Sequence, residues 1–583
     1  MDNTRIAASE APSQRFVNWL GGPSHLKWLL LCVFVGGLIS ALPNLISALQ
    51  SGSPVWIADN DEIMYTCLTS QSYLHHLWRF SDPALPPGQG HVSYPWIVFA
   101  PGILTAKVLG AGPGLVMFFL RIWGGVSLGA AWFLLIGEFV RKRWLAASCA
   151  IFFLVDAGVL AIRPVIRPLL ISLALLRGRG QEYFATNPQL HPEWRIMTPA
   201  LNLGVALFYL FLLQRARRDP CRRTIYAAGL ALGLLIWSYF YFWTACIVAL
   251  AISFLLDTEH RTLYAKVGGL GLLVGFPSLA TSYLLKHTTS RDWLWRNDQF
   301  LPVPRFGPVG FSRLPFLLVI IGFFIVWRYR KDLIPLWAVP ASALALNYSS
   351  FVTGIEIEGF HWQYLWAYTL ALLALLVLMG FVEHKEGWIR YPLLLFVILE
   401  CGIGLSLRAV EAVRTQQSTE FTAAYRSARG QLAINAPLCE DAVIAGDKGF
   451  VDSVQLLGPY RPLSHYVLDY SPTTTDRDLY EREVLNAFLL GVPRRVFLEQ
   501  KRIYFNSSSA RGRERRDPAV RDARLQSLAE TFDRIVSEPA PEIRKYEVRY
   551  LAVRRSSPLK PRIGPDWRTV QSGEWQIWER PIP

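Results

Sequence analysis

The sequence WLLLCVFVGGLISALPNLISAL at residues 28–49, followed closely by VWIADNDEIMY at residues 55–65, decides the fold of this chain. The first stretch is apolar and long enough to cross a membrane, because a helix needs roughly 20 apolar residues to span the hydrocarbon core. It is too long for a cleavable signal peptide, and no small-residue cleavage site follows it. We therefore expect a retained membrane anchor with an acidic segment directly beyond it.

The composition of the whole chain agrees with a membrane protein. Its 583 residues are 52% hydrophobic and 18% charged, whereas soluble globular proteins carry about 25% charged residues. Disordered and collagen-like classes are excluded, and a soluble enzyme is disfavoured. We attribute the net charge of +15 to the cytoplasmic loops of a polytopic protein, and we expect no nucleic-acid partner. The scattered cysteines indicate neither a zinc site nor a disulfide framework.

Further apolar stretches predict about eleven membrane spans in total. The run 225–256 is too long for one helix, and we divide it at its aromatic centre, WSYFYFW at residues 237–243. The glycines between Gly268 and Gly275 lie inside an apolar stretch, so they indicate close helix packing rather than a nucleotide-binding loop. The predicted spans are 28–49, 115–139, 144–162, 196–213, 225–240, 241–256, 267–285, 314–327, 333–351, 364–382 and 391–409.

The short segment 96–110 decides the predicted orientation. It contains Pro101 and Lys107, and we expect it to lie at the membrane interface rather than to span. The basic clusters then fall on one side, which the positive-inside bias assigns to the cytoplasm. Those clusters are 141–143, 215–223, 328–331 and Lys385 with Arg390. Residues 1–27 are therefore expected in the cytoplasm, and residues 28–411 in a transmembrane domain whose first outer loop is 50–114.

The character of the chain changes after residue 411. No apolar run of membrane length occurs in 412–583. Short strand-like pieces occur at 442–445, 549–553 and 574–578, and a charged helical pattern covers 518–537. We expect one α/β or α+β soluble domain, on the outer (periplasmic) face of the membrane.

An acidic cluster stands directly after the first predicted span. Asp59, Asp61 and Glu62 place three carboxylates within four residues. One interpretation is a helix start, with Asp59 or Asn60 as the N-cap and the other acids in the first turn, where the helix dipole favours negative charge. The other is catalytic, with one carboxylate as general base for a hydroxyl nucleophile and a second that orients it or holds a cation. The two interpretations are compatible.

Other charged residues are candidates for substrate binding. Asp156 lies deep in the third predicted span, where an acid is either functional or paired with an arginine such as Arg163 or Arg121. Arg163, Arg167 and Arg195 lie on the predicted outer side, against the positive-inside bias. They either bind an anion such as phosphate or simply belong to a long loop that crosses regardless of charge. His191 in the same loop is ambiguous between a catalytic and an exposed histidine.

The loop between the ninth and tenth predicted spans combines acids, an imidazole and aromatic rings. Glu358, His361 and Trp362 fall there, on the same predicted face as Asp59. Aromatic rings beside hydrogen-bond acceptors suit a sugar, whose C–H faces stack on rings while its hydroxyls need partners. The alternative is that Trp362 and Tyr364 belong to an aromatic belt at the membrane interface.

Taken in order, these parts resemble the membrane glycosyltransferases of the GT-C fold, whose relatives include protein O-mannosyltransferases and 4-amino-arabinose lipid A transferases. The resemblance lies in loose motifs, and its strength is their order and sidedness along most of the chain. The motifs are the acidic pair Asp59 and Asp61, an interfacial helix ending in Leu109-Gly110, Phe118 with Arg121, and the segments 193–199, 239–243 and 354–362.

The resemblance implies a polyprenyl-phosphate sugar as donor and a first-loop acid as base. Asp59 is the best match and Asp61 the second, but the sequence Asp-Asn-Asp-Glu departs from the family's pattern, so which carboxylate acts stays open. A divalent metal is compatible with the resemblance, and no cofactor is otherwise indicated. The expected partners are membrane lipids, the donor and an envelope acceptor, and the expected location is the bacterial inner membrane.

Two functions therefore follow from the sequence. The first is an inverting transferase that moves a sugar from the lipid phosphate to a lipid, glycan or protein hydroxyl at the outer leaflet. The second is a non-catalytic polytopic protein, either a lipid or solute transporter or a scaffold for envelope assembly. A common outward-facing site for Asp59, Glu358, His361 and the outer arginines would favour the first function.

Overall fold

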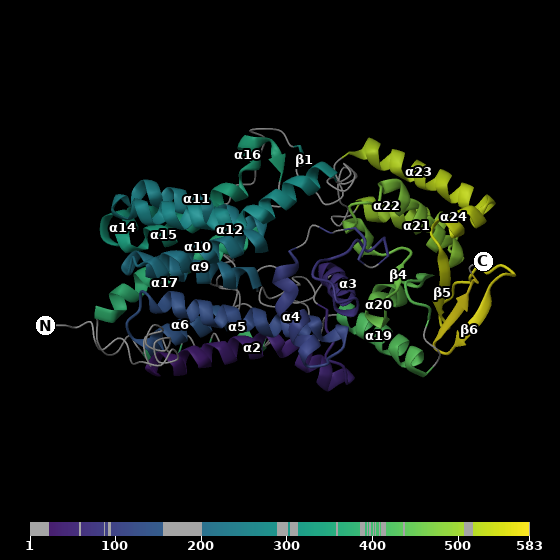
Figure 1. The fold of residues 1–583 in the computed structure, drawn as a ribbon, viewed down its shortest axis with the longest axis horizontal. Coiled ribbons are helices and arrows are strands. Elements are labelled where there is room, and N and C mark those ends of the chain that lie inside the picture. Colours follow the sequence, from purple (N-terminus) through teal and green to yellow (C-terminus); the bar gives the residue numbers. More distant parts are fainter. Residues whose placement is uncertain are drawn as a thin grey trace.

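The structure, a computed structural model, consists of a helical bundle beside a smaller α/β unit, hereafter the C-terminal unit (Figure 1). It describes residues 23–581 with internal gaps. The gaps are 58–59, 87, 91, 93–94, 156–200, 289–300, 303–312, 357–359, 385–390, most of 393–415, 435–437 and 507–516.

Helices occupy ten of the eleven predicted spans. Their bounds are α2 (Pro23–Ser51), α5 (Val116–Gly137), α6 (Arg143–Val155), α9 (Asn202–Arg218), α10 (Arg222–Ser238), α11 (Phe240–Leu256), α12 (Arg261–Thr288), α14 (Arg313–Tyr329), α15 (Ile334–Asn347) and α17 (Phe360–His384). Among the described residues, three helical segments are long and apolar enough to cross a membrane, namely His25–Ser51, Pro113–Gly137 and Thr258–Leu284. The full count of eleven spans stays a prediction.

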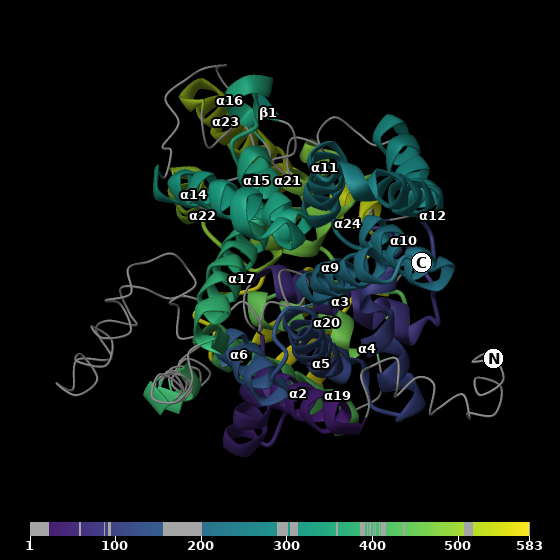
Figure 2. The same cartoon turned by 90° about the vertical axis from the view of Figure 1, so that its left-hand side faces the viewer.

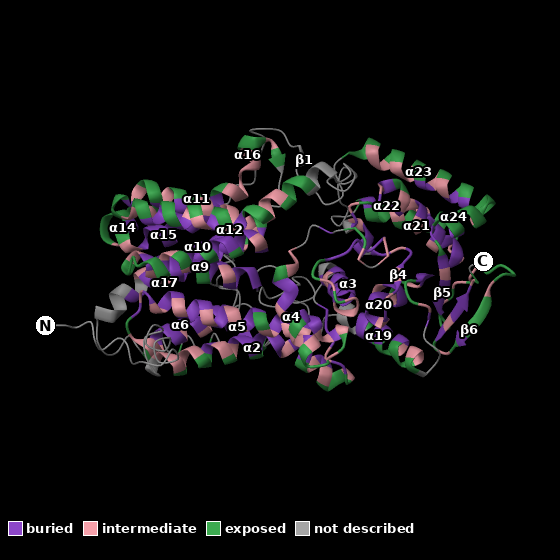
Figure 3. Ribbon diagram, viewed as in Figure 1, coloured by how far each residue is buried: buried purple, intermediate pink, exposed green. Residues whose placement is uncertain are grey.

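The outward faces of several bundle helices are apolar and exposed (Figure 3). On α12, Leu273 is 71% and Phe276 65% exposed, and on α14 Phe324 is 64% exposed. Soluble monomers rarely expose contiguous apolar patches of this kind. Such apolar outward faces are typical of helices that lie in a membrane, which agrees with the three candidate spans.

Glycines show that α2 and α5 run antiparallel. A methyl group added at Gly36 would collide with the backbone of Gly125, and one added at Gly129 would collide with the backbone of Cys32. Cys32 faces Gly129 and Gly36 faces Gly125, so residue numbers increase along α2 in the direction in which they decrease along α5. Two candidate spans that run antiparallel must have an even number of crossings between them, which agrees with the prediction that 96–110 does not span. The helix there, α4 (Trp96–Val108), has 13 residues and is about 20 Å long, shorter than the hydrocarbon core of about 30 Å.

The long apolar run 225–256 forms two helices, as predicted. Tyr239 interrupts it in an extended conformation (φ −157°, ψ 117°) between α10 and α11. A methyl group at Gly229 would meet Leu270, and one at Gly233 would meet Val274. Because the residue numbers increase in the same direction along both helices, α10 and α12 are parallel, and α11 runs between them in the chain. Gly271 and Gly275 face Leu232 and Ile236 of α10 at distances that leave no room for a methyl group, so the predicted packing role is confirmed for these two glycines, whereas a methyl group at Gly269 would meet no atom within 4 Å among the described residues.

Three of the predicted basic clusters meet at one end of the bundle. Arg215 and Arg218 pair with Glu138 at 3.3 and 2.9 Å, directly before the cluster 141–143. Arg217 donates to the backbone oxygen of Lys331 (3.1 Å), which follows α14. The predicted outer loops also meet each other, because β1 (Leu301–Pro302) pairs with β2 (Ile355–Glu356). These three clusters thus share one end of the bundle, whereas the fourth predicted cluster, Lys385 with Arg390, lies outside the described residues.

The first outer loop contributes helices at the other end of the bundle. Besides α4 it forms α3 (Asn60–Leu74) and a short turn, η2 (Pro113–Leu115). Figure 2 shows the bundle from its far end, with α2, α5 and α6 on one side and α14, α15 and α17 on another. Apolar side chains of α3 belong to the same buried core as those of α2, α4 and α5.

The C-terminal unit contains a five-stranded mixed sheet in the order β4-β3-β5-β7-β6. The strands β3 (Val443–Gly446), β5 (Val548–Arg554) and β7 (Trp575–Glu579) overlap the three predicted strand pieces, and β4 (Arg461–Pro462) and β6 (Arg568–Ser572) lie at the two edges of the sheet. The helices are α19 (Gln416–Ile434), α20 (Lys448–Leu457), η7 (Tyr466–Tyr470), α21 (Asp476–Leu489), α22 (Arg494–Asn506), α23 (Pro518–Ser537) and α24 (Pro539–Lys545). The predicted helix 518–537 is α23.

Helices cover both faces of this sheet. Leu551 and Val553 of β5 pack with α21 to α24 on one face, whereas Tyr550 and Ala552 pack with α19 and α20 on the other. The alternation is the period of two that a strand imposes on its side chains. The face covered by α19 and α20 lies towards α3 (Figure 1), and α20 packs directly against α3.

Candidate functional site

The acidic segment opens helix α3. The helix begins at Asn60, so Asp61 and Glu62 stand in its first turn, as the helix-start interpretation expects, and the N-cap role of Asp59 or Asn60 stays a prediction. Asp59 lies outside the described residues, and the side chain of Asp61 is not described. Glu62 is 3% exposed. A carboxylate buried to this degree requires a charged or hydrogen-bonding partner.

Arg121 on α5 is that partner. Its guanidinium forms an ion pair with Glu62 and is itself fully buried. It also donates to Oδ1 of Asn44 (2.9 Å) and to the backbone oxygen of Trp56 (3.2 Å). Its Cζ atom lies 4.6 Å from the centroid of the Trp56 ring. One arginine therefore ties together α2, α3, α5 and the segment that precedes Asp59.

The chain just before the acidic segment is held by helix α2. Nδ2 of Asn44 donates to the backbone oxygen of Pro54 (2.6 Å). Oγ of Ser47 donates to the backbone oxygens of Ser53 (2.9 Å) and Val55 (3.0 Å). With the bond from Arg121 to Trp56, the carbonyl groups of residues 53–56 are all held by side chains of the bundle. A catalytic group on the next few residues would have a fixed position, as catalysis by an oriented group requires.

The buried polar side of α3 continues past Glu62. Thr66 and Ser70 follow it at intervals of four residues and are 1% and 0% exposed, so the three side chains share one helix face. Among the described residues, the hydroxyls of Thr66 and Ser70 have no hydrogen-bond partner, whereas Thr69 donates to the backbone oxygen of Tyr65 (2.8 Å). Buried unpaired hydroxyls are uncommon, and each calls for an explanation such as a bound water or ligand.

A second polar cluster brings together two motifs that are far apart in the sequence. Nδ1 of His361 lies 2.5 Å from the hydroxyl of Tyr239, and its ring stacks on Tyr241 with centroids 4.5 Å apart. Nε1 of Trp362 donates to Oγ1 of Thr244 (3.2 Å). The aromatic break between α10 and α11 and the start of α17 therefore form one cluster.

Within this cluster His361, and not Trp362, is accessible. Trp362 is 1% exposed and packs under Tyr241. His361 and Tyr241 are half-buried, and Phe240 is 43% exposed. The partly open surface of the cluster thus consists of an imidazole and neighbouring aromatic rings.

Several predicted site residues cannot be placed. Asp59, Asp156, Arg163, Arg167, His191, Arg195 and Glu358 lie outside the described residues. The described candidates fall into two separate sets. Glu62 belongs to the α2–α3–α5 network, and His361 with Trp362 belongs to the α10–α11–α17 cluster. The predicted common site of all candidates stays a prediction.

The sequence interpretation did not identify the groups that hold the candidates. Arg121 was noted for its family resemblance and as a partner of Asp156, but not as the partner of Glu62. Asn44 has no role in the sequence interpretation, and Tyr239 enters it only as part of the aromatic segment 237–243. The sequence does contain a signal for Arg121 and Asn44, because a polar or charged residue inside an apolar span generally has a structural or functional partner.

One group of side chains among the described residues has the spacing of a metal site. Asp257, Glu259 and His260 lie close enough to share an ion. However, Asp257 already accepts from Arg217 (2.8 Å), Tyr264 (2.7 Å) and His260 (3.1 Å). Burial raises the pKa of Asp257, but these hydrogen bonds outweigh it and hold the pKa below its usual value. The group lies beside the basic clusters, at the end of the bundle opposite α3, and we assign it a structural role.

Comparisons with known proteins give a likeness in three dimensions only. No protein-family model and no curated protein matches the sequence. Among solved structures, the chain is similar to an oligosaccharyltransferase of Archaeoglobus fulgidus tethered with an acceptor peptide (12% identity, TM-score 0.48), over 92% of this chain and 69% of that one. It is also similar to ArnT from Cupriavidus metallidurans bound to undecaprenyl phosphate (11% identity, TM-score 0.47), over 97% and 98%. These proteins are GT-C glycosyltransferases, the family that the order of sequence motifs resembles.

Proposed function

We propose that this protein transfers a sugar from a polyprenyl-phosphate donor to a hydroxyl of an envelope acceptor at the outer leaflet. The observation that carries the proposal is the buried network of Arg121, Glu62 and Asn44. It fixes an acidic helix start at the end of the bundle next to the C-terminal unit. The donor class is the one that the sequence resemblance implies.

In the proposed reaction Asp59 or Asp61 is the general base. The carboxylate takes the proton of the acceptor hydroxyl while that oxygen forms a bond to the anomeric carbon of the sugar. The bond from this carbon to the phosphate oxygen breaks, and the lipid phosphate leaves with its electron pair. The single displacement inverts the anomeric configuration. A positioned base of this kind contributes about 10²- to 10⁴-fold to the rate.

Other residues have supporting roles in this proposal. Glu62 is paired with Arg121, so it serves to hold the first turn of α3 rather than to accept the proton. The outer arginines Arg163, Arg167 and Arg195 would stabilise the charge that develops on the leaving phosphate. His361, with Glu358, would orient the sugar or the acceptor. The remaining assignments, among them the cytoplasmic N-terminus and the periplasmic location of 412–583, belong to the same proposal.

The experiment is to incubate the purified full-length protein with a panel of polyprenyl-phosphate sugars and a membrane extract as acceptor. We expect consumption of one donor, release of the lipid phosphate, and a product whose anomeric configuration is opposite to that of the donor. A product with retained configuration would contradict the single displacement. Absence of consumption across the panel would contradict the proposed donor class.

A further inference from the structure

The C-terminal unit contacts the first outer loop at three separated places. The contacts involve the segment before Asp59, the middle of α3 and the turn between α3 and α4. Apolar residues of the C-terminal unit, including Phe421, Tyr425 and Leu456, share the bundle's buried core with α3. The two parts of the molecule are therefore packed together at this point rather than joined only by the chain.

The first contact holds the backbone next to the acidic segment. Oγ1 of Thr422 on α19 donates to the backbone oxygen of Val55 (3.0 Å), four residues before Asp59. Thr422 is 4% exposed. The same oxygen accepts from Ser47 of α2, so one carbonyl group receives hydrogen bonds from both parts of the molecule. One turn further along α19, a Cβ atom added at Gly114 would lie 3.1 Å from the hydroxyl of Tyr425.

The second contact involves a buried aspartate of the first outer loop. Oδ2 of Asp82 accepts from Oγ of Ser471 (2.9 Å) and Oγ1 of Thr473 (2.6 Å). Its other carboxylate oxygen accepts from the backbone N–H of Ala84 (2.9 Å). Asp82 is 1% exposed. Because a buried carboxylate depends on such hydrogen bonds, the turn after α3 is fixed to the segment that follows η7.

The third contact lies in the middle of α3. Sγ of Cys67 is 3.9 Å from the backbone oxygen of Asp452 on α20. The side chain of Asp452 is in turn paired with His465 (3.3 Å). Burial raises the pKa of Asp452, but its contacts with His465 and Lys448 outweigh it and lower the pKa. Burial also raises the pKa of the Cys67 thiol, so this cysteine packs here as an uncharged group.

We propose that the C-terminal unit positions the acidic segment for reaction, with Thr422 and Asp82 as positioning residues. The proposal rests on the proposed function. Asp59 and Asp61 lie between two anchored points of the chain. Thr422 holds the backbone at Val55 on the N-terminal side, and Asp82 holds the turn after α3 on the C-terminal side. Loosening either contact leaves substrate binding largely intact but misplaces the carboxylate, and a small misplacement of a catalytic group lowers the rate strongly.

The test compares Thr422→Val with Thr422→Ser in the full-length protein. Valine removes the donor hydroxyl with little change of shape, whereas serine keeps it. Hydrogen–deuterium exchange of peptides covering 53–65 is measured together with kcat and KM for donor consumption. We expect the valine variant to exchange about fivefold faster in 53–65, which corresponds to one lost hydrogen bond. We also expect its kcat to fall with KM nearly unchanged, and the serine variant to recover both values. Asp82→Asn should produce a larger increase in the exchange rate of 53–65 than Thr422→Val does.

Ser427→Ala is the matched control. Ser427 lies on the same helix as Thr422, and its hydroxyl contacts only Glu574 and Trp575 within the C-terminal unit among the described contacts. Unchanged exchange of 53–65 in Thr422→Val, or an equal increase in Ser427→Ala, would overturn the proposal. So would faster exchange with an unchanged kcat. If the wild type consumes no donor, the proposed function fails, while the exchange data still decide whether the C-terminal unit holds the loop.

Discussion

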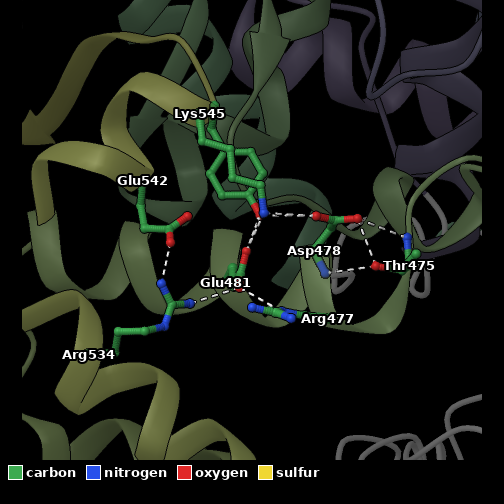
Figure 4. A network of polar contacts seen from close by, with 8 residues as sticks. Thr475, Arg477, Asp478, Glu481, Arg534, Glu542 and Lys545 are labelled. Atoms are coloured by element: carbon green, nitrogen blue, oxygen red, sulfur yellow. Dashed lines mark hydrogen bonds and ion pairs between the residues drawn. The ribbon is translucent and has the colours of Figure 1, made fainter.

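Two buried glutamates, one in each part of the molecule, are stabilised in different ways. Glu62 in the bundle has Arg121 as its ion-pair partner, and both side chains are almost completely buried. Glu481 in the C-terminal unit contacts Arg477 (3.0 Å), Arg534 (2.8 Å) and Lys545 (2.5 Å), as Figure 4 shows. The hydroxyl of Tyr546 also donates to Glu481 (2.8 Å).

The difference indicates that the Glu62 pair fixes local geometry, whereas the contacts of Glu481 stabilise the fold of the C-terminal unit. The three cationic partners of Glu481 are partly exposed, with 44% to 81% of each side chain accessible, so water can replace a lost contact. Neither member of the Glu62–Arg121 pair can be hydrated in this way. A buried pair costs desolvation energy, and its retention beside the acidic segment agrees with a positioning role.

The largest effect is expected from breaking the buried pair on one side only. Arg121→Met leaves the charge of Glu62 buried without its guanidinium, and we expect a loss of about 3 to 5 kcal/mol of stability. The double variant Glu62→Gln with Arg121→Met removes both charges and should be more stable than Arg121→Met alone. Denaturant unfolding in detergent measures the stability of both variants. Equal stability of the single and double variants would show that the loss in Arg121→Met does not come from the unpaired charge of Glu62.

An intermediate effect is expected from acid on the C-terminal unit. Burial raises the pKa of Glu481, but hydrogen bonds from Lys545, Tyr546 and Arg477 outweigh it and lower the pKa below the usual 4.5. A carboxyl group whose pKa is lower in the folded state stabilises the protein fully above the unfolded value. That stability is lost as the pH falls through the folded value.

Thermal unfolding of the C-terminal unit should therefore become easier below about pH 4.5. Glu481→Gln removes this titrating group, so the variant should start from a lower stability and depend less on pH in this range. An equally steep pH dependence in Glu481→Gln and the wild type would assign the acid sensitivity to other carboxylates, such as Glu579, whose pKa is also lowered.

The smallest effect is expected from removing one cation of several. Lys545→Met leaves Glu481 with two arginines and Tyr546, and the Lys545 side chain is nearly half exposed. Pairs of this exposure contribute about 1 kcal/mol or less. A loss in Lys545→Met as large as that in Arg121→Met would show that the two glutamates are stabilised alike.

Local features of the fold could be predicted from the sequence because they depend on neighbouring residues. The break at Tyr239 followed from the length of an apolar run, and β5 and α23 followed from their periodicity. The helix start at Asn60 followed from the acids around it. The strand β6 was not predicted, since its residues are mostly exposed and show no apolar alternation.

The candidate site depends on contacts that no local pattern reveals. Arg121 meets Glu62 across 59 positions of the chain, and Tyr239 meets His361 across 122. Asp82 in a short loop had no sequence signal that linked it to Ser471, 389 positions later. Such pairs are determined by how the helices and the C-terminal unit pack, and a single sequence does not record that arrangement.

The rate of donor consumption in Asp59→Asn, Asp61→Asn and Glu62→Gln, compared with the wild type, tests the central claim most directly. The account predicts that one aspartate variant loses about 100-fold or more of the rate while its unfolding transition stays that of the wild type. Glu62→Gln should instead lose stability together with part of its activity. Wild-type rates in both Asp59→Asn and Asp61→Asn would contradict the assignment of the acidic segment as the catalytic base.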